Sequence, residues 1–194
     1  MDSVLFFALG SVLVLALFYL KERMAGFASQ KPEDYDTGEP FDLRQHLNGP
    51  IICEGVIYGP LGRVSSRFVG EFEANWDGNQ GTMKEFFRYD SGDTQAREWD
   101  LRLGNDGSIE ARAPDVIGTG MGKHMGSSVV LNYRIRLPEA SGGHVLNAID
   151  WMYLAPNGTI VNRSQFRKFG IRVAELVATM RPADVGEISK RNAA

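Results

Sequence analysis

The chain has 194 residues, a length that suits one ordinary domain with an appendage. Its hydrophobic content of 43% and charged content of 23% are typical of a globular protein, which excludes disorder along the whole chain. A net charge of −3 with scattered Lys and Arg argues against a nucleic-acid binder, since such a protein needs a basic stripe. The single cysteine, Cys53, excludes an internal disulfide and is interpreted as a small buried thiol.

The N-terminal segment is an almost unbroken apolar run over residues 4–20. At about 1.5 Å per residue, a helix of this length nearly covers a hydrocarbon core about 30 Å thick. Tyr19, Lys21 and Arg23 follow in the order expected of an interfacial anchor. The sequence therefore predicts an uncleaved transmembrane anchor over residues 1–23.

A cleaved signal peptide is the alternative for this segment. Such a signal begins with basic residues and has a shorter apolar core, whereas this chain begins with Met-Asp-Ser. Gly26, Phe27 and Ala28 form a possible small-x-small cleavage site, but the charged residues 21–23 separate it from the apolar run.

Residues 24–40 are predicted to be a linker, because Gly, Pro and acidic residues follow one another there without any period. Such a linker would hold the folded domain a short distance from the bilayer. We predict the folded domain over residues 41–181 and a flexible polar tail over residues 182–194.

The folded domain shows a period of two, interrupted by recurring turn signals such as Asn105-Asp106-Gly107. No amphipathic helix of useful length occurs in it. The pattern predicts an all-β fold: an antiparallel up-and-down barrel of about nine or ten strands, with a two-sheet sandwich as the alternative. The predicted strands are 51–58, 66–76, 82–89, 94–103, 108–113, 116–125, 129–137, 145–154, 159–166 and 171–180.

The middle hairpin gives an ambiguous register. A two-residue loop at Ser91-Gly92 places Phe86 opposite Arg97 and Lys84 opposite Trp99, and neither face is then cleanly apolar. Either a bulge shifts the register or the inside of the barrel holds charges, which must then be paired or meet something polar.

Four arginines occupy the centres of predicted strands: Arg67, Arg97, Arg134 and Arg163. Two of them pointing inward could hold a carboxylate or phosphate through paired hydrogen bonds. Pointing outward, they would be ordinary solvated side chains.

Alternating glycines mark another candidate position, at Gly118, Gly120 and Gly122. In a strand they leave one face without side chains, which makes room for a ligand or for an aromatic ring packed flat on the backbone. The run is not a dinucleotide-binding fingerprint, because no helix follows it.

Asp150 and Trp151 are predicted to lie on opposite faces of one strand. Asp150 could pair with an arginine such as Arg163 on the next strand. A site for the head group of a ligand is the alternative.

A set of motifs, each weak alone, resembles the bacterial domain-of-unknown-function family 3833 in order and spacing. The resemblance covers about residues 41–180. The motifs are Phe41-Asp42-Leu43, Asn48-Gly49-Pro50, Arg67-Phe68, Glu85-x-Phe87-x-Tyr89, Arg97-x-Trp99, Asp115-Val116-Ile117-Gly118, Asp150-Trp151-Met152, Asn162-Arg163 and Lys168-Phe169-Gly170.

The resemblance implies a lipocalin-like or calycin-like barrel without an established activity. Many members begin with an export or lipoprotein signal, which implies an envelope location, and their genes often lie beside genes for fatty-acid modification such as cyclopropanation. This chain departs from the lipoprotein pattern, since it has an apolar anchor and no acylatable cysteine.

The two indications of orientation disagree. Lys21 and Arg23 follow the span and no basic residue precedes it, which favours the cytoplasm under the positive-inside rule. The family resemblance favours export. We predict a single-pass protein of the inner membrane with its domain in the periplasm, the cytoplasm being the alternative.

The leading functional hypothesis is a membrane-anchored barrel that binds an apolar or amphipathic ligand such as a lipid or fatty acyl chain. A factor that docks on a membrane protein is the second hypothesis, and a lipid-modifying enzyme is the third. The sequence contains no complete catalytic set, and its three histidines lack metal-ligand spacing, so no catalytic residue, metal or cofactor is predicted. The candidate ligand-binding residues are Arg67, Arg97, Trp99, Asp115, Gly118, Gly120, Gly122, Asp150, Trp151 and Arg163.

Overall fold

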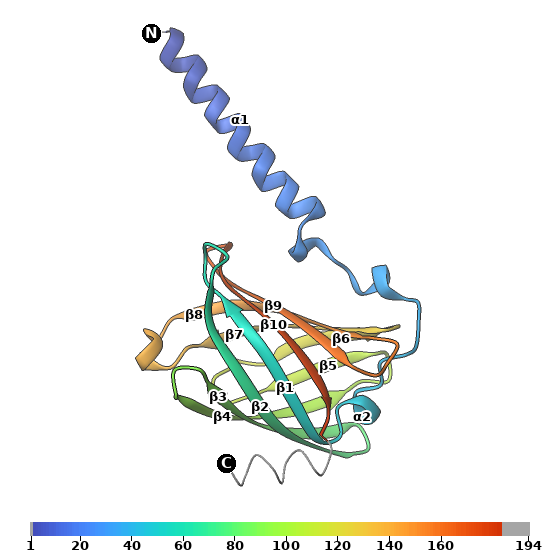
Figure 1. Cartoon of the computed structure of the whole chain (residues 1–194). Helices are drawn as coiled ribbons and strands as arrows, with labels where there is room; N and C mark the ends of the chain where they lie inside the picture. Colours follow the sequence, from blue (N-terminus) through green and yellow to red (C-terminus); the bar gives the residue numbers. More distant parts are fainter. Residues whose placement is uncertain (1, 184–194) are drawn as a thin grey trace.

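The computed structural model describes residues 2–183, and the predicted flexible tail lies outside them from residue 184 onward. An N-terminal helix, α1 (Asp2–Ala25), is joined to a barrel of ten strands (Figure 1). The strands are β1 (Gly49–Tyr58), β2 (Val64–Asp77), β3 (Gln80–Tyr89), β4 (Thr94–Leu103), β5 (Ser108–Arg112), β6 (Gly120–Met125), β7 (Ser128–Arg136), β8 (Val145–Leu154), β9 (Ile160–Lys168) and β10 (Ile171–Pro182).

Each strand pairs antiparallel with its neighbours in sequence, and β10 pairs with β1 to close the barrel. Closure leaves no strand of the barrel with an unpaired edge. The predicted antiparallel up-and-down barrel is therefore confirmed.

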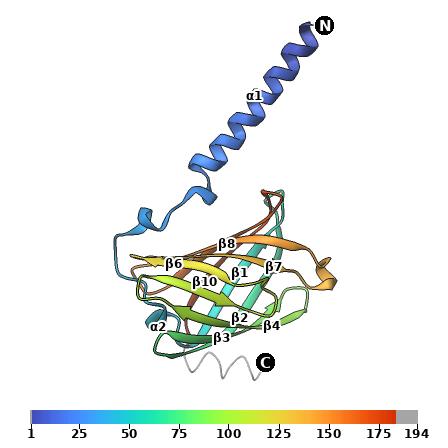
Figure 2. The ribbon, with the colours of Figure 1, turned by 180° about the vertical axis from the view of Figure 1, so that it is seen from behind.

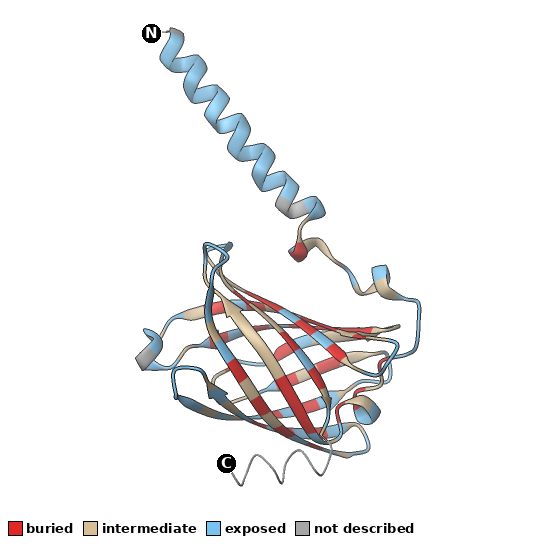
Figure 3. Cartoon of the chain, in the orientation of Figure 1, coloured by how far each residue is buried: buried red, intermediate tan, exposed pale blue. Residues whose placement is uncertain are grey.

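Burial alternates along the strands, as Figure 3 shows. On β2, Phe68, Phe72 and Ala74 are buried inside the barrel, whereas the intervening Glu73 and Asn75 are exposed. Most of the buried apolar side chains of the barrel form one continuous core. At roughly 25 cal/mol per Å² of apolar area, this core is the main stabilising contribution to the fold.

The hairpin of β3 and β4 differs by one residue from the predicted register. Its loop has three residues rather than two, because Tyr89 donates its amide to the carbonyl of Asp93 and Gly92 occupies a left-handed conformation with φ of 91°. Arg97 therefore lies opposite Glu85, not Phe86, and Trp99 lies opposite Met83, not Lys84. The register therefore shifts, as one alternative required, and the interior also holds the charges of Glu85 and Arg97, as the other alternative required.

One end of the barrel is covered by the single-turn helix α2 (Leu43–His46), which the sequence pattern did not reveal. The Asp42 side chain caps it by accepting a hydrogen bond from the Arg44 amide. Leu43 and Leu47 are buried in the core, and the Trp76 indole donates to the Leu47 carbonyl at 2.7 Å. This hydrogen bond ties the helix to β2.

The segment predicted as a linker packs along the outer wall of the barrel in two short 3-10 helices, η1 (Phe27–Ser29) and η2 (Pro32–Tyr35). Figure 2 shows it passing beside β6. Phe27 joins Trp151 in a small buried cluster on this wall, and the Tyr153 hydroxyl donates to Gln30 Oε1 at 2.7 Å. These contacts fix the place from which α1 leaves the domain.

Helix α1 is the one described helix long and apolar enough to cross a membrane, over Ser3–Lys21. None of this span is buried against the barrel (Figure 3). The exposed apolar surface fits a membrane anchor or a signal sequence better than a core helix, which would be covered.

Candidate ligand-binding site

The interior of the barrel combines an apolar wall with a cluster of charged side chains. Alternation on β3 turns Met83, Glu85 and Phe87 inward, and alternation on β4 turns Arg97 and Trp99 inward. Because Glu85 and Arg97 are direct partners in the β3–β4 ladder, their side chains meet inside the barrel.

The Arg97 guanidinium is held on three sides. Its Nε lies 3.4 Å from Glu85 Oε2, and its Nη2 donates to Asp115 Oδ1 at 3.0 Å. Its central carbon lies 4.4 Å from the centre of the Trp99 ring, which adds a cation–π contact. Asp115 comes from the connection between β5 and β6, so three segments of the chain fix this one cation.

Asp150 lies in the same cavity, on β8. Ser164 Oγ and Asn162 Nδ2 donate to its Oδ1 at 2.7 and 2.5 Å. The predicted pairing with Arg163 is wrong, because Arg163 lies opposite Trp151 in the β8–β9 ladder and shares the outer face with it. Ser164 is the residue opposite Asp150 and therefore supplies the inward hydrogen bond.

Burial changes the titration of both interior carboxyl groups. Loss of water raises the pKa of Glu85 from 4.5 to about 7, although the Arg97 charge acts in the opposite direction. Burial also raises the pKa of Asp150 against the hydrogen bonds from Ser164 and Asn162. Glu85, Asp115 and Asp150 together supply three carboxyl groups around the single guanidinium of Arg97.

The cavity has a volume of about 110 Å³. Leu43 and Leu47 of the α2 region form its floor, and aromatic side chains such as Phe68 and Phe72 form part of its wall. The polar groups of Glu85, Arg97 and Asp150 converge on it, and so do Tyr133, Asn162 and Ser164. Pockets for drug-sized ligands have volumes of about 300–1,000 Å³, so this cavity accommodates a small group unless the barrel opens.

Two buried polar atoms of the side chains that line this cavity have no hydrogen bond to the described residues: Glu85 Oε2 and Arg97 Nε. Their separation of 3.4 Å permits electrostatic attraction, but the geometry is not that of a hydrogen bond. Buried polar atoms of this kind are costly, and such a site can accept a bound molecule that satisfies them.

Of the predicted site residues, Arg97, Trp99, Asp115 and Asp150 lie in or against this interior cluster. Of the four arginines at strand centres, only Arg97 points inward, so the alternative in which two arginines hold an anion together does not apply. Arg67 is exposed and pairs with Asp90, while Arg163 lies on the outer wall and pairs with Glu175. Arg134 is exposed on β7.

Trp151 also faces outward, where Tyr35 and Phe27 of the linker cover it. Its ring packs edge-on against Tyr35 with the ring centres 5.3 Å apart. The prediction that Asp150 and Trp151 occupy opposite faces is confirmed, although the face of Trp151 binds the linker of the same chain.

The glycine run does not provide the predicted bare face. Gly118 precedes β6, outside any strand, with φ of 78°. A Cβ at Gly122 would lie 2.3 Å from the Val130 carbonyl oxygen, and one at Gly120 would lie 3.0 Å from Tyr133 Cβ. Gly120 and Gly122 therefore permit close packing of β6 against its neighbours, and no room for a ligand remains beside them.

Glu85, Tyr133, Asn162 and Ser164 are interior polar residues that were not among the predicted ligand-binding residues. The sequence places Glu85 on a face of β3 that carries both apolar and charged residues. Its partner on β4 depends on the length of the β3–β4 loop, which the sequence pattern does not determine. In the described part of the chain, no group of three or more His, Cys, Asp or Glu side chains is arranged to hold a metal ion. Burial raises the pKa of the Cys53 thiol, so it remains a neutral core side chain.

The family model described as "Protein of unknown function (DUF3833)" matches residues 22–182, which include the linker and every strand. The chain belongs to the DUF3833 family. A comparison of this DUF3833 member with curated proteins found no significantly similar sequence.

Two solved structures share the fold of this DUF3833 member. An S-type phycobiliprotein lyase, CPES from Guillardia theta, superposes with a TM-score of 0.54 and 6% identity, covering 80% of this chain and 98% of the lyase. Rv2717c from M. tuberculosis superposes with a TM-score of 0.53 and 15% identity, covering 72% of this chain and 94% of that chain. At these identities the likeness establishes a shared lipocalin-like barrel and leaves the ligand and the activity to the site itself.

Proposed function

We propose that this protein is a membrane-anchored barrel that binds a small amphipathic molecule, with the polar group of the ligand between Glu85 and Arg97. The observation that carries the proposal is a pair of buried atoms without a hydrogen bond, Glu85 Oε2 and Arg97 Nε, on two side chains that line the cavity. The lyase among the structural relatives acts on a phycobiliprotein according to its name, which supports ligand handling by this barrel type.

A hydroxyl group fits these two atoms best. It accepts a hydrogen bond from the Arg97 N–H and donates one to a Glu85 carboxylate oxygen, so a single group satisfies both. A free fatty acid fits less well, because its carboxylate would join three carboxyl groups around one guanidinium. We therefore propose an alcohol or another neutral hydrogen-bond donor on a lipid-like body.

The apolar part of the ligand would lie among Phe68, Phe72 and Phe87, which face the cavity. The present volume of about 110 Å³ accommodates the polar group and a short apolar part. A longer chain requires an exit at the end opposite α2, where Ile57 and Val173 are only partly buried.

Helix α1 is proposed to keep the barrel at the inner membrane as an uncleaved single-pass anchor, with the domain in the periplasm. This location would give the cavity access to lipids. A fusion of alkaline phosphatase to the C-terminus tests the side: activity supports the periplasm, and an inactive but expressed fusion contradicts it.

Native mass spectrometry of the full chain released from detergent micelles tests the binding function. We expect a retained amphiphile that carries a hydroxyl or another neutral donor group. The Glu85→Leu/Arg97→Met variant, which removes the polar pair, should retain less of it. An empty wild-type barrel that also fails to bind added straight-chain alcohols would contradict the proposal.

An enzymatic role is the second candidate, favoured by the raised pKa of Glu85 near 7. A carboxyl group with this pKa can exchange a proton near neutral pH, as a general acid or base must. Glu85→Gln would then abolish turnover of the bound molecule while leaving its binding in place.

A further inference from the structure

The strongest exposure of apolar side chains on the barrel is confined to two turns. Outside α1, the described large apolar residues with the greatest exposed fraction are Phe169 (91%), Leu61 (90%) and Ile171 (70%). Leu61 lies in the turn between β1 and β2, and the other two lie at the turn between β9 and β10. The turns are neighbours, since β1 pairs with β10 and Tyr58 lies opposite Glu175.

Folding alone does not account for Phe169. Its φ of 52° makes it the one described non-glycine residue with a positive φ. Turns of this kind favour Asn or Gly, because an aromatic side chain gains nothing from the left-handed conformation and loses backbone stability. An aromatic ring that is strained at the backbone and uncovered by the protein indicates a role outside the folded core.

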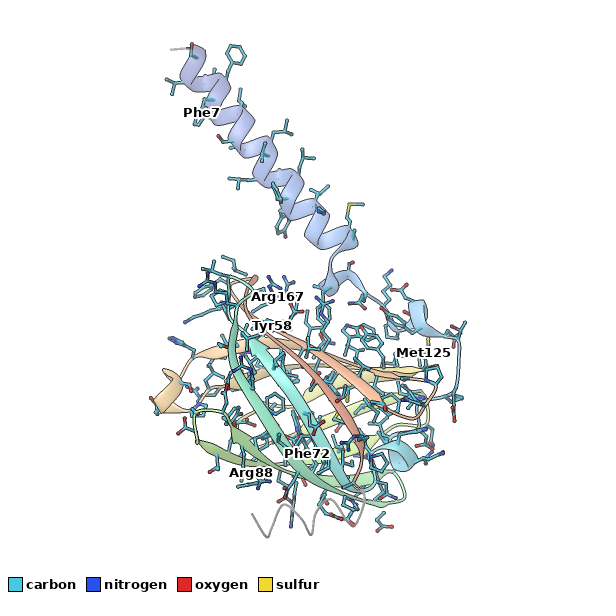
Figure 4. The ribbon with its side chains drawn as sticks, in the orientation of Figure 1. Phe7, Tyr58, Phe72, Arg88, Met125 and Arg167 are labelled. Atoms are coloured by element: carbon cyan, nitrogen blue, oxygen red, sulfur yellow. The ribbon has the colours of Figure 1, made fainter. Side chains whose placement is uncertain are left out.

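The two turns lie beside the C-terminal part of α1, the part nearest the barrel. A shared hollow is lined by Phe18 and Tyr19 of α1 and by Pro60, Gly170 and Ile171 of the turns. Figure 4 shows Tyr58 and Arg167, which flank the turns, at the end of the barrel below α1. Phe18 belongs to the candidate membrane span, so Ile171 lies near the depth at which that span meets the interface.

The charge of the turns complements an anionic lipid surface. Residues 59–65 and 166–172 contain four basic residues and no acidic residue, and one of the four, Arg172, is paired with Glu175 of β10. Arg63 is exposed, and Lys168 lies over the Phe169 ring at 5.9 Å. Basic side chains beside exposed apolar ones are typical of segments that bind the bilayer interface.

We propose that the two turns insert into the interface of the bilayer that α1 crosses, with Leu61, Phe169 and Ile171 among the lipid chains and Arg63 and Lys168 at anionic head groups. This inference rests on the proposed membrane anchoring and adds a second contact that fixes the orientation of the barrel. The end opposite α2 then faces the membrane, so a lipid-like ligand can reach the cavity without crossing water.

A fluorescent label at Phe169→Cys tests the insertion in the full chain. The native thiol of Cys53 is buried, so an environment-sensitive NBD group attaches only to the introduced cysteine. The chain is reconstituted in vesicles of phosphatidylcholine with phosphatidylglycerol. We expect a blue-shifted emission that lipid-bound quenchers reduce and aqueous iodide does not.

Asn105→Cys provides the matched control, because Asn105 is exposed in a turn beside α2 at the other end of the barrel. Its label should be quenched by iodide and not by the lipid-bound quencher. Arg63→Gln in the Phe169→Cys background should shift the equilibrium toward the iodide-accessible state in these anionic vesicles, and the effect should be smaller in pure phosphatidylcholine.

Flotation of the same samples separates the two proposals. If the chain floats with the vesicles but the label at position 169 is as accessible to iodide as the label at 105, the anchor is supported and the insertion is overturned. A chain that does not float overturns both. A label protected from iodide but unaffected by the lipid-bound quencher indicates a protein contact, which also overturns the insertion.

Discussion

Glu85 and Arg97 lie directly opposite each other across the β3–β4 ladder, and their facing atoms, Oε2 and Nε, are 3.4 Å apart inside the barrel without a hydrogen bond between them. A buried ion pair rarely stabilises a protein more than apolar side chains of similar size would, since desolvation opposes the attraction. The other polar side chains on this side of the barrel interior, Asp150, Asn162 and Ser164, are hydrogen-bonded to one another. This pair of Glu85 and Arg97 is the observation from which we propose that the barrel binds a ligand.

The first prediction concerns the pH dependence of stability. The pKa of Glu85 rises from 4.5 to about 7 on burial, so between these values the folded protein holds a proton that the unfolded chain has released. This contribution is complete below the lower value and is lost as the pH rises through the higher one, with an upper limit of about 3 kcal/mol. Glu85→Gln should lack it.

Urea unfolding of the full chain in detergent, at a series of pH values, measures this difference. The free energy of unfolding of wild type should fall relative to that of Glu85→Gln between about pH 5 and pH 8. Parallel curves for the two proteins would show that Glu85 titrates as it does in water.

The second prediction concerns the cation. Arg97→Met leaves Glu85 and Asp115 without their shared partner and should lower the free energy of unfolding by about 3 to 5 kcal/mol. The Glu85→Leu/Arg97→Met variant should recover much of this loss, because it removes the uncompensated Glu85 charge as well. Chemical denaturation of the three proteins gives the comparison, and an Arg97→Met protein as stable as wild type contradicts it.

The third prediction concerns close packing at β6. Gly122→Ala places a Cβ 2.3 Å from the Val130 carbonyl oxygen, so the β6–β7 backbone must move. We expect a loss of about 1 to 3 kcal/mol. Met121→Ala, next in the strand but 53% exposed, is the control and should change stability by less than about 1 kcal/mol. Equal effects of the two substitutions in thermal unfolding would count against the packing argument.

The fourth prediction concerns the linker. Phe27→Ala removes a buried ring that packs on Trp151 and lies 4.8 Å from the Arg163 guanidinium carbon. Amide hydrogen exchange should become faster over residues 26–36, while the barrel strands keep their protection. Phe169→Ala, an equally large change at a residue 91% exposed, should leave the exchange of the linker unchanged. Unchanged linker exchange in Phe27→Ala would mean that this contact does not hold it.

The architecture could be predicted from the sequence because strands and turns are encoded locally. The turn at Asn105-Asp106-Gly107 joins β4 and β5 as its composition indicates, with Gly107 at φ of 81°. No turn motif in the sequence indicates the pairing of β1 with β10, because the two strands are far apart along the chain. Closure is expected because it pairs the backbone groups of the two edge strands.

The site could be predicted only in part, because its partners depend on register. Asp90 leaves the β3–β4 ladder: its Oδ1 accepts from the Arg67 amide, which lengthens the loop by one residue and brings Glu85 to Arg97. The predicted partner of Asp150, Arg163, is wrong for the same reason. Arg163 is one position from Ser164 on β9, so it points outward while Ser164 points inward toward Asp150. A shift of one residue exchanges the two faces of a strand, so periodicity without register cannot name the contacts.

Calorimetric titration of the full chain with straight-chain alcohols, from butanol to decanol, and with the matching carboxylic acids tests the central claim most directly. We predict that alcohols bind more tightly than the acids of equal length at neutral pH. This preference should disappear in Glu85→Leu/Arg97→Met. Tighter binding of the acids, or no binding of either series, would contradict a cavity built to place a neutral polar group between Glu85 and Arg97.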